Sequence, residues 1–266
     1  MTLSKRRYFE LLYERYNDPQ YIHPDPLELV RAYDEPGDRE VAGLVCSALA
    51  LGRVAGILSA CREVLSVVPA PRADVLEAST ASLRRKLRGF VYRFFREDDI
   101  VEFLLAIGEV LRRHGTLEEC FLTGHTTDDA LPGLEVLVSE LRSTGRRFPD
   151  ILVPVPNRGS ACKRHHLFLR WMVRRDAVDP GGWTRVTPGG LRVPVDTHML
   201  QVARHLGITE RKQADERTSW AITQFFRTIS PHDPVRYDFV LTRAGISGRE
   251  MIRQDVYEAD FHVRPA

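Results

Sequence analysis

Apolar residues recur every three or four positions along most of this chain. That spacing puts them on one face of a helix, which can then pack against a neighbouring helix. The clearest stretches are 41–48, 57–68, 100–111, 134–141, 167–172 and 221–229. Asp233 and Pro234 indicate a further helix start, because they are a capping residue and the residue favoured at the first helical position. The pattern predicts an all-α protein.

Proline and glycine mark four breaks between the predicted helices. These breaks are VPAPRAD (68–74), STGRRFPD (143–150), VPVPNRGS (153–160) and DPGGWTRVTPGGLRVP (179–194). The last one is long and contains Trp183, which leaves two interpretations open. It is either a functional loop or a plain surface excursion or short hairpin.

Length and composition leave room for a packed core and exclude several classes of protein. The 266 residues, of which 43% are hydrophobic, suit one large domain or two small ones. No apolar run approaches the roughly 18 residues of a membrane span. The N-terminal segment also lacks the apolar stretch of a secretory signal. We expect a cytoplasmic protein with no membrane partner.

The four cysteines, Cys46, Cys61, Cys120 and Cys162, are scattered along the chain and include no C-x-x-C pair. This spacing suits neither a zinc ribbon nor a cysteine-ligated iron–sulfur cluster. We therefore expect free thiols, no metal site and no cofactor.

The net charge of +2 is unevenly distributed. The stretch 84–96 holds six arginines and lysines without an acid, interleaved with Phe90, Tyr92, Phe94 and Phe95, and 158–175 holds six more cations, again without an acid. Such clusters attract a phosphate backbone. They are equally typical of two solvated helix faces, so charge alone does not identify a partner.

Asp196 occupies a distinctive position in the stretch VPVDTHMLQVARHLG (193–207). Apolar residues at helical spacing follow it, and Gly207 is a natural stop. Aspartate is among the best residues for accepting the free N–H groups of a first turn. The simplest interpretation is that Asp196 caps a helix.

A second distinctive position is Lys163, near the start of another predicted helix. If Ser160 is the N-cap, then Ala161, Cys162 and Lys163 fill the first turn. A cation is disfavoured at the positive end of a helix dipole. Lys163 is therefore a candidate nucleophile, although an exposed lysine or a simple phosphate contact would also fit.

The order of these parts is a Pro/Gly hairpin, a lysine-led helix, a loop, and then V-P-V-D-x-H-M. This order resembles the helix-hairpin-helix superfamily of DNA glycosylases, which includes endonuclease III and 8-oxoguanine DNA glycosylase. VPNRG (155–159) aligns with the hairpin L-P-G-V-G of that superfamily, and KRHHLFLRWMV (163–173) aligns with its lysine-led helix. VPVDTHM (193–199) aligns with a nearly identical segment of the 8-oxoguanine enzymes. The stretch DREVAGLVCSALALGRV (38–54) resembles a bacterial branch known only as a domain of unknown function.

The resemblance implies roles for individual residues. Lys163 takes the place of the catalytic lysine and Asp196 that of the catalytic aspartate. The DNA-binding candidates are the hairpin residues Asn157, Arg158 and Gly159, together with Arg164 and His198. Weaker candidates for the base pocket are Arg53, Trp171, Trp183 and Tyr237, of which Trp171 lies on an apolar stripe and suits the core better.

The resemblance also implies an architecture. It predicts a single helical unit over 1–266 with two lobes, approximately 38–150 and 151–266, and with 1–37 packing elsewhere. The N- and C-terminal helices would form one lobe and the central helices the other. The hairpin and Asp196 would face a cleft.

The implied function is base-excision repair. Such an enzyme removes a damaged or modified base from double-stranded DNA, and we expect it to be a monomer associated with the nucleoid. Oxidised purine is the first expectation for the base and a modified pyrimidine the second. If Lys163 attacks C1′ of the sugar, a Schiff base forms and the strand can be nicked; otherwise water completes the reaction.

Two alternatives remain open from sequence. One is a helix-hairpin-helix module that binds nucleic acid without chemistry. The other is a metal-dependent hydrolase using His165, His166, Asp176, Asp196 and His198. Adjacent His165 and His166 would point about 100° apart on a helix, which disfavours a shared metal.

Overall fold

The computed structural model describes residues 5–156 and 159–247, and it confirms the all-α prediction. The α-helices are α1 (Lys5–Tyr16), α2 (Leu27–Val30), α3 (Pro36–Leu49), α4 (Val54–Val67), α5 (Pro71–Glu77), α6 (Thr80–Lys86), α7 (Glu97–His114), α8 (Leu117–Leu122), α9 (Leu131–Ser143), α10 (Lys163–Val173), α11 (Thr197–His205), α12 (Glu216–Arg227) and α13 (Asp238–Ser247). Short 3-10 turns cover Pro19–Tyr21 and Pro188–Gly190. Strands β1 (Val91–Tyr92) and β2 (Phe95–Arg96) form one hairpin.

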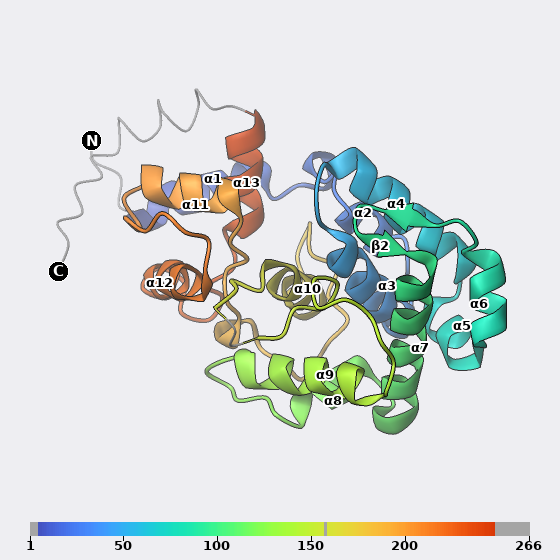
Figure 1. The fold of residues 1–266 in the computed structure, drawn as a ribbon. Helices are drawn as coiled ribbons and strands as arrows, with labels where there is room; N and C mark the ends of the chain where they lie inside the picture. The colour runs from blue at the N-terminus through green and yellow to red at the C-terminus, as the bar shows by residue number, and fades with distance from the viewer. Residues whose placement is uncertain (1–4, 157–158, 248–266) are drawn as a thin grey trace.

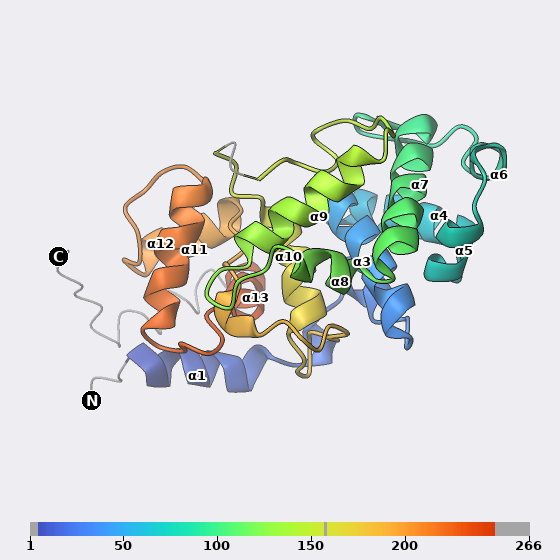
Figure 2. The ribbon, with the colours of Figure 1, turned by 90° about the horizontal axis from the view of Figure 1, so that it is seen from below.

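The helices gather in two groups with α10 between them (Figures 1 and 2). Helices α2 to α7 lie on one side, whereas α1, α11, α12 and α13 lie on the other. Helix α1 packs on α13, but α2 packs on α3. Residues 5–37 are therefore divided between the two groups.

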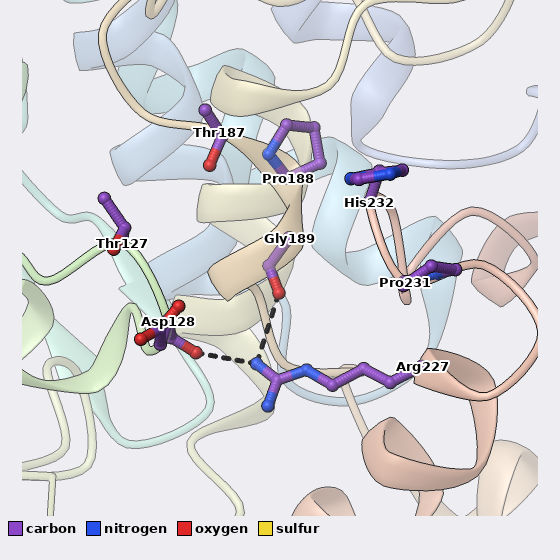
Figure 3. Close-up of a pocket in the computed structure, with 8 residues that line it drawn as sticks. All are labelled: Thr127, Asp128, Thr187, Pro188, Gly189, Arg227, Pro231 and His232. Atoms are coloured by element: carbon purple, nitrogen blue, oxygen red, sulfur yellow. Dashed lines mark hydrogen bonds between the residues drawn. The ribbon is translucent and has the colours of Figure 1, made fainter.

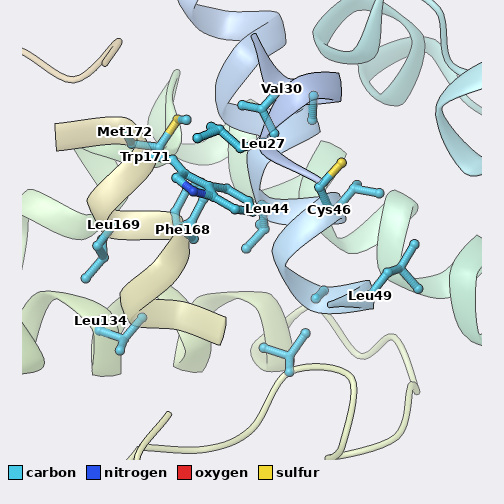
Figure 4. Close-up of a cluster of buried hydrophobic side chains, with 14 of the residues drawn as sticks. Leu27, Val30, Leu44, Cys46, Leu49, Leu134, Phe168, Leu169, Trp171 and Met172 are labelled. Atoms are coloured by element: carbon cyan, nitrogen blue, oxygen red, sulfur yellow. The ribbon is translucent and has the colours of Figure 1, made fainter. Parts of the chain in front are cut away.

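Helices α3 and α10 form the centre of the core (Figure 4). Phe168, Trp171 and Met172 of α10 are fully buried there. Gly43 permits the close approach, because a Cβ at that position would meet Met172 Cε at 3.0 Å. The core therefore fixes the direction in which α10 presents its first residue.

Each of the six apolar stretches falls on one helix, and these helices are α3, α4, α7, α9, α10 and α12. The stretches 57–68 and 221–229 run past the ends of α4 and α12. One break is shorter than predicted, since Pro71 within 68–74 begins α5. The prediction of a helix start at Asp233 and Pro234 is wrong. The chain turns there instead, the Asp233 carboxylate pairs with Arg174, and α13 begins at Asp238.

The long break 179–194 is neither a solvated excursion nor a hairpin. It runs along the core, with Trp183, Val186 and Leu191 buried. The Trp183 indole donates a hydrogen bond to Glu40 of α3 at 3.0 Å. The same carboxylate accepts the Leu117 N–H at the start of α8, and burial raises the pKa of Glu40 to about 7. Tertiary contacts therefore hold a segment whose composition is typical of a loop.

No single helix in the described ranges is both long and apolar enough to cross a membrane. Helices α4 and α5 are long and apolar enough only when they are taken together, and the axis of one is bent by 60° from that of the other.

Candidate catalytic site at the starts of α10 and α11

Asp196 is the N-cap of α11, as predicted. Its backbone is extended (φ −115°, ψ −171°), and its carboxylate accepts the Met199 N–H through Oδ1 at 2.8 Å. The preceding residues Pro194 and Val195 are buried, which anchors the chain before the cap. The second carboxylate oxygen, Oδ2, remains available for another partner.

Helix α10 begins at Lys163, and the prediction that Ser160 caps it is wrong. Cys162 is the N-cap residue and adopts a left-handed backbone (φ +44°). The Ser160 hydroxyl accepts the Cys162 N–H at 3.2 Å. This local bond closes a turn before the helix, so the helix starts later than composition suggests.

The two helix starts bring Lys163 and Asp196 together. Lys163 Nζ lies 3.0 Å from Asp196 Oδ2, and the two side chains are 35% and 27% exposed. The pair is therefore partly shielded from water but open enough for another molecule to reach it. An ion pair of this exposure contributes little to stability, about 1 kcal/mol or less.

The surroundings keep the Asp196 carboxylate ionised. Burial raises the pKa of Asp196, but the Lys163 ammonium, the Met199 N–H and the charge of His198 together outweigh it. The pKa is consequently below its usual value, and the group is negatively charged at neutral pH. His198 itself is exposed on the first turn of α11.

This arrangement suits two kinds of chemistry. A fixed carboxylate stabilises positive charge that develops on a bound molecule, most strongly where water is excluded. A lysine amine that has lost its proton can attack an electrophilic carbon. Lys163 and Asp196 offer both functions to a single reacting atom.

Arg164 is not placed to contact DNA, which corrects the sequence interpretation. Its guanidinium is buried and donates to the backbone carbonyls of Ala48 and Ile151. Burial lowers its pKa to about 10. The side chain ties α10 to the end of α3 and to the segment before the hairpin, because buried carbonyl groups need donors.

The predicted hairpin is described only in part. Asn157 and Arg158 lie outside the described residues. Gly159 is exposed and has φ +80°, a left-handed conformation that glycine adopts freely. Its carbonyl accepts the Glu216 N–H at 3.5 Å, so this segment lies beside the start of α12.

Three of the four base-pocket candidates belong to the core instead. Trp171 and Tyr237 are 0% exposed and Trp183 is 6% exposed. Tyr237 donates to Glu10 at 2.8 Å, and Trp183 packs against Phe121 and Phe168. Large aromatic side chains stabilise the fold most when they are buried, and these three are buried in the core and do not line a base pocket. Arg53, the fourth candidate, is exposed at the N-cap of α4.

The ligands required by the metal-hydrolase alternative do not converge. Within 5–156 and 159–247, no three or more His, Cys, Asp or Glu side chains are grouped so that they could hold a metal ion. Asp176 instead accepts from Tyr13 at 2.7 Å and from Arg174 at 2.8 Å. His165 is buried and its Nε2 lies 2.7 Å from the Pro154 carbonyl.

A separate surface hollow of about 700 Å³ lies between Thr127–Asp128, Thr187–Gly189 and Pro231–His232 (Figure 3). Arg227 crosses it and donates to the carbonyls of Asp128 and Gly189 at 2.8 and 3.2 Å. Neither Lys163 nor Asp196 lines this hollow, so it is distinct from their pair.

A buried charge network, which the sequence pattern did not reveal, lies at the other end of α10. Arg170 of α10 and Arg174, the C-cap residue after it, share the fully buried Asp179, and they also pair with Asp238 and Asp233 respectively. Burial raises the pKa of Asp238 to about 6. The charge of Arg170 lowers this pKa, and the charge of Asp196 raises it further. The available signal was the four-residue spacing of two arginines across the end of this helix.

Comparison with known proteins identifies a family for most of this chain. The sequence model of the family described as "Protein of unknown function (DUF2400)" matches residues 25–247. No curated protein and no solved structure matches the chain.

Proposed function

This chain belongs to the DUF2400 family, and we propose that it is a DNA N-glycosylase that acts through Lys163 and Asp196. The proposal includes a two-lobed glycosylase fold in which the hairpin before α10 holds the DNA backbone. The partner is double-stranded DNA that carries a damaged or modified base.

One observation carries this proposal: Lys163 Nζ and Asp196 Oδ2 are 3.0 Å apart although the two residues lie 33 positions apart in the chain. The motif resemblance assigns to these two residues the roles of catalytic lysine and catalytic aspartate. The pairing joins the starts of two helices, at the two positions that the resemblance singles out. Their partial exposure leaves room for a substrate atom to approach both side chains.

The chemistry follows from the two groups. A duplex buries C1′ of the sugar, so the target nucleotide must first leave the base stack. As the bond between base and C1′ lengthens, positive charge builds on the sugar, and the ionised Asp196 stabilises it. Lys163 gives up a proton and its nitrogen bonds to C1′. The bond between C1′ and the base breaks at the same time, and the departing base takes up a proton.

Strand cleavage is a further step of the same proposal. Opening of the sugar ring converts the new bond to an imine between Lys163 and C1′. The imine acidifies the proton on C2′, and its removal expels the 3′ phosphate and breaks the strand. Water then hydrolyses the imine and returns the free lysine. If water rather than Lys163 attacks C1′, an abasic site remains and the strand stays intact.

The experiment uses the full chain and a panel of duplexes, each with one damaged or modified base, in the presence of borohydride. Borohydride reduces an imine to a stable amine, so a Lys163 intermediate becomes a covalent protein–DNA adduct. Lys163→Gln is expected to abolish the adduct. Asp196→Asn is expected to slow base release by about 100-fold or more, because a preorganised charge is lost from the transition state.

Two matched variants control for charge and capping. Lys212→Gln removes an exposed lysine from the loop before α12. Asp215→Asn changes the N-cap of α12, which accepts the Thr218 N–H and pairs with Arg211 at 2.6 Å, much as Asp196 caps α11 and pairs with Lys163. Both controls should retain activity. Base release without an adduct would assign the attack to water, and salt-dependent binding of every duplex without base release would identify a binding module instead.

A further inference from the structure

The surface hollow drawn in Figure 3 lies outside the site formed by Lys163 and Asp196. We call it the Arg227 hollow, because Arg227 crosses it between the segments 127–128, 187–189 and 231–232. Its volume of about 700 Å³ is within the ordinary range for small-molecule sites, about 300 to 1,000 Å³. The hollow is therefore large enough for a small ligand.

The walls of the Arg227 hollow are held by bonds between segments far apart in the chain. The Ala130 N–H donates to the Gly190 carbonyl at 2.9 Å, which joins the loop before α9 to the 3-10 turn Pro188–Gly190. Gly190 permits this approach, because a Cβ there would lie 2.9 Å from the Thr127 carbonyl oxygen. The hollow is thus formed before any ligand arrives, which lowers the cost of binding.

Arg227 forms the third wall and carries a charge that no acid neutralises. Its Nη2 donates to the carbonyls of Asp128 and Gly189 at 2.8 and 3.2 Å. Its guanidinium also lies 5.1 Å from the centre of the Trp220 ring. Within 5–156 and 159–247, Arg227 forms no ion pair with a carboxylate. The guanidinium is held in one orientation, and its charge and other N–H groups stay available.

Asp128 brings the opposite charge to the same hollow. It is exposed in the loop before α9, whereas Arg227 comes from the end of α12 (Figure 3). The Asp128 carboxylate forms no hydrogen bond or ion pair with any residue that the structure describes. The neighbouring Asp129 differs, because it pairs with Arg192 at 2.5 Å and accepts the Leu131 N–H at 3.1 Å. One of these two carboxylates therefore keeps its charge free for a ligand.

Two hydroxyl groups and two proline rings complete the lining. The hydroxyls of Thr127 and Thr187 form no hydrogen bond in the described part of the chain, so each can donate to a ligand or accept from it. Pro188 and Pro231 add apolar surface. This lining suits a small molecule that combines charged groups with an apolar part.

The two free charges decide the class of ligand. Phosphate would be attracted by Arg227 but repelled by Asp128, and a simple cation would meet the reverse. A molecule with an anionic and a cationic group a few ångströms apart can pair with both residues. The guanidinium also matches a carboxylate in shape, since its N–H groups form a planar fork. These requirements describe a zwitterion with a carboxylate and an ammonium group.

We propose that the Arg227 hollow binds a free α-amino acid, whose carboxylate pairs with Arg227 and whose ammonium group pairs with Asp128. This site goes beyond the proposed catalysis and does not depend on it. Arg227 is about 16 Å along α12 from Glu216, whose N–H donates to Gly159 beside the hairpin, because a helix rises about 1.5 Å per residue.

The test measures binding of amino acids to the full chain. The proteinogenic amino acids are screened one by one by thermal shift, and the tightest ligand is then titrated by isothermal calorimetry. Its N-acetyl derivative lacks the ammonium charge, and its carboxamide lacks the carboxylate charge. Each derivative should bind about 10- to 150-fold more weakly than the parent, the range for one hydrogen bond to a charged group.

Two variants match the two derivatives. Asp128→Asn should weaken binding of the parent amino acid by a similar factor without weakening binding of the N-acetyl derivative. Arg227→Gln should weaken binding of the parent without weakening binding of the carboxamide. This crossed pattern cannot arise from a general loss of folding. The matched controls Glu210→Gln and Arg217→Gln remove an exposed acid and an exposed arginine of α12, and both should bind as wild type does.

The outcomes separate this proposal from the catalytic one. Absence of binding by every amino acid, or equal binding of the parent by wild type and Asp128→Asn, would refute the amino-acid site. Inorganic phosphate that binds as tightly as the amino acid would also refute it and would show a plain anion site. Lys163→Gln and Asp196→Asn should bind the amino acid as wild type does. Their loss of base release therefore tests the glycosylase alone.

Discussion

The two ends of α10 carry cations in opposite settings. At its start, Lys163 meets Asp196 where both side chains are about one third exposed. At its end, Arg170 and the C-cap residue Arg174 meet Asp179, and these three side chains are 4% exposed or less. Water reaches the first pair and is excluded from the second.

This difference separates a candidate site from a structural element. Buried charges that lose a partner are costly, so the inner network constrains where α10, α13 and the segment after α10 lie. An exposed pair contributes little to folding and can exchange partners with a ligand. The buried end therefore fixes the helix, and the open end is free to react.

The largest effect on stability should come from the buried end. Asp179→Asn leaves two buried arginines without their shared carboxylate and should lower the free energy of unfolding by about 3 to 5 kcal/mol. Chemical denaturation measures this change. Glu14→Gln breaks an exposed pair with Arg7 and should cost about 1 kcal/mol or less. Similar values for the two variants would contradict the contrast between the ends.

The middle of α10 should make stability depend on pH. Burial lowers the pKa of His166 to about 3. The folded state then keeps the ring neutral below about pH 6.5, while the unfolded chain takes up a proton. Stability from this group is full above pH 6.5 and is lost as pH falls toward 3, by about 1.4 kcal/mol per pH unit.

The measurement compares denaturation of wild type and His166→Gln between pH 7 and pH 5. Other groups titrate in the same range, so the difference between the two proteins is the informative quantity. As pH falls, the free energy of unfolding of wild type should decrease more than that of His166→Gln. Parallel curves would show that His166 takes up its proton in the folded state.

The smallest effects should come from the caps. Asparagine caps a helix about as well as aspartate, so Asp196→Asn and Asp215→Asn should each lower the free energy of unfolding by about 1 kcal/mol or less. Thermal denaturation of both variants tests this expectation. A loss of several kcal/mol for Asp196→Asn alone would make Asp196 a structural residue and would weaken its catalytic assignment.

The apolar pattern predicted six of the described helices, because each of them buries a stripe at helical spacing: α3, α4, α7, α9, α10 and α12. It did not single out the short helices α2, α5, α6 and α8, nor α1. It did not predict the β1–β2 hairpin, whose strands are two residues long and show no measurable alternation. It also misplaced the start of α13, because Asp233 found a tertiary partner in Arg174 instead of a local N–H group.

Motif order singled out Lys163 and Asp196, and local chemistry correctly assigned the Asp196 cap. The aromatic candidates failed because one sequence does not show which large side chains a neighbouring helix covers. Trp183 illustrates this point, since its loop-like surroundings hide an indole bonded to the distant Glu40. The same limit applied to Arg164, whose carbonyl partners come from two other segments.

The sequence by itself therefore determined the helical class, most helix positions and the capping role of Asp196, since these depend on neighbours within a few residues. Only the tertiary structure decided that Lys163 reaches Asp196, that Arg164 is buried and that Arg227 reaches the loop before α9. Each of these depends on contacts between segments far apart in the chain. Packing selects such contacts from among many that the pattern of residues allows equally.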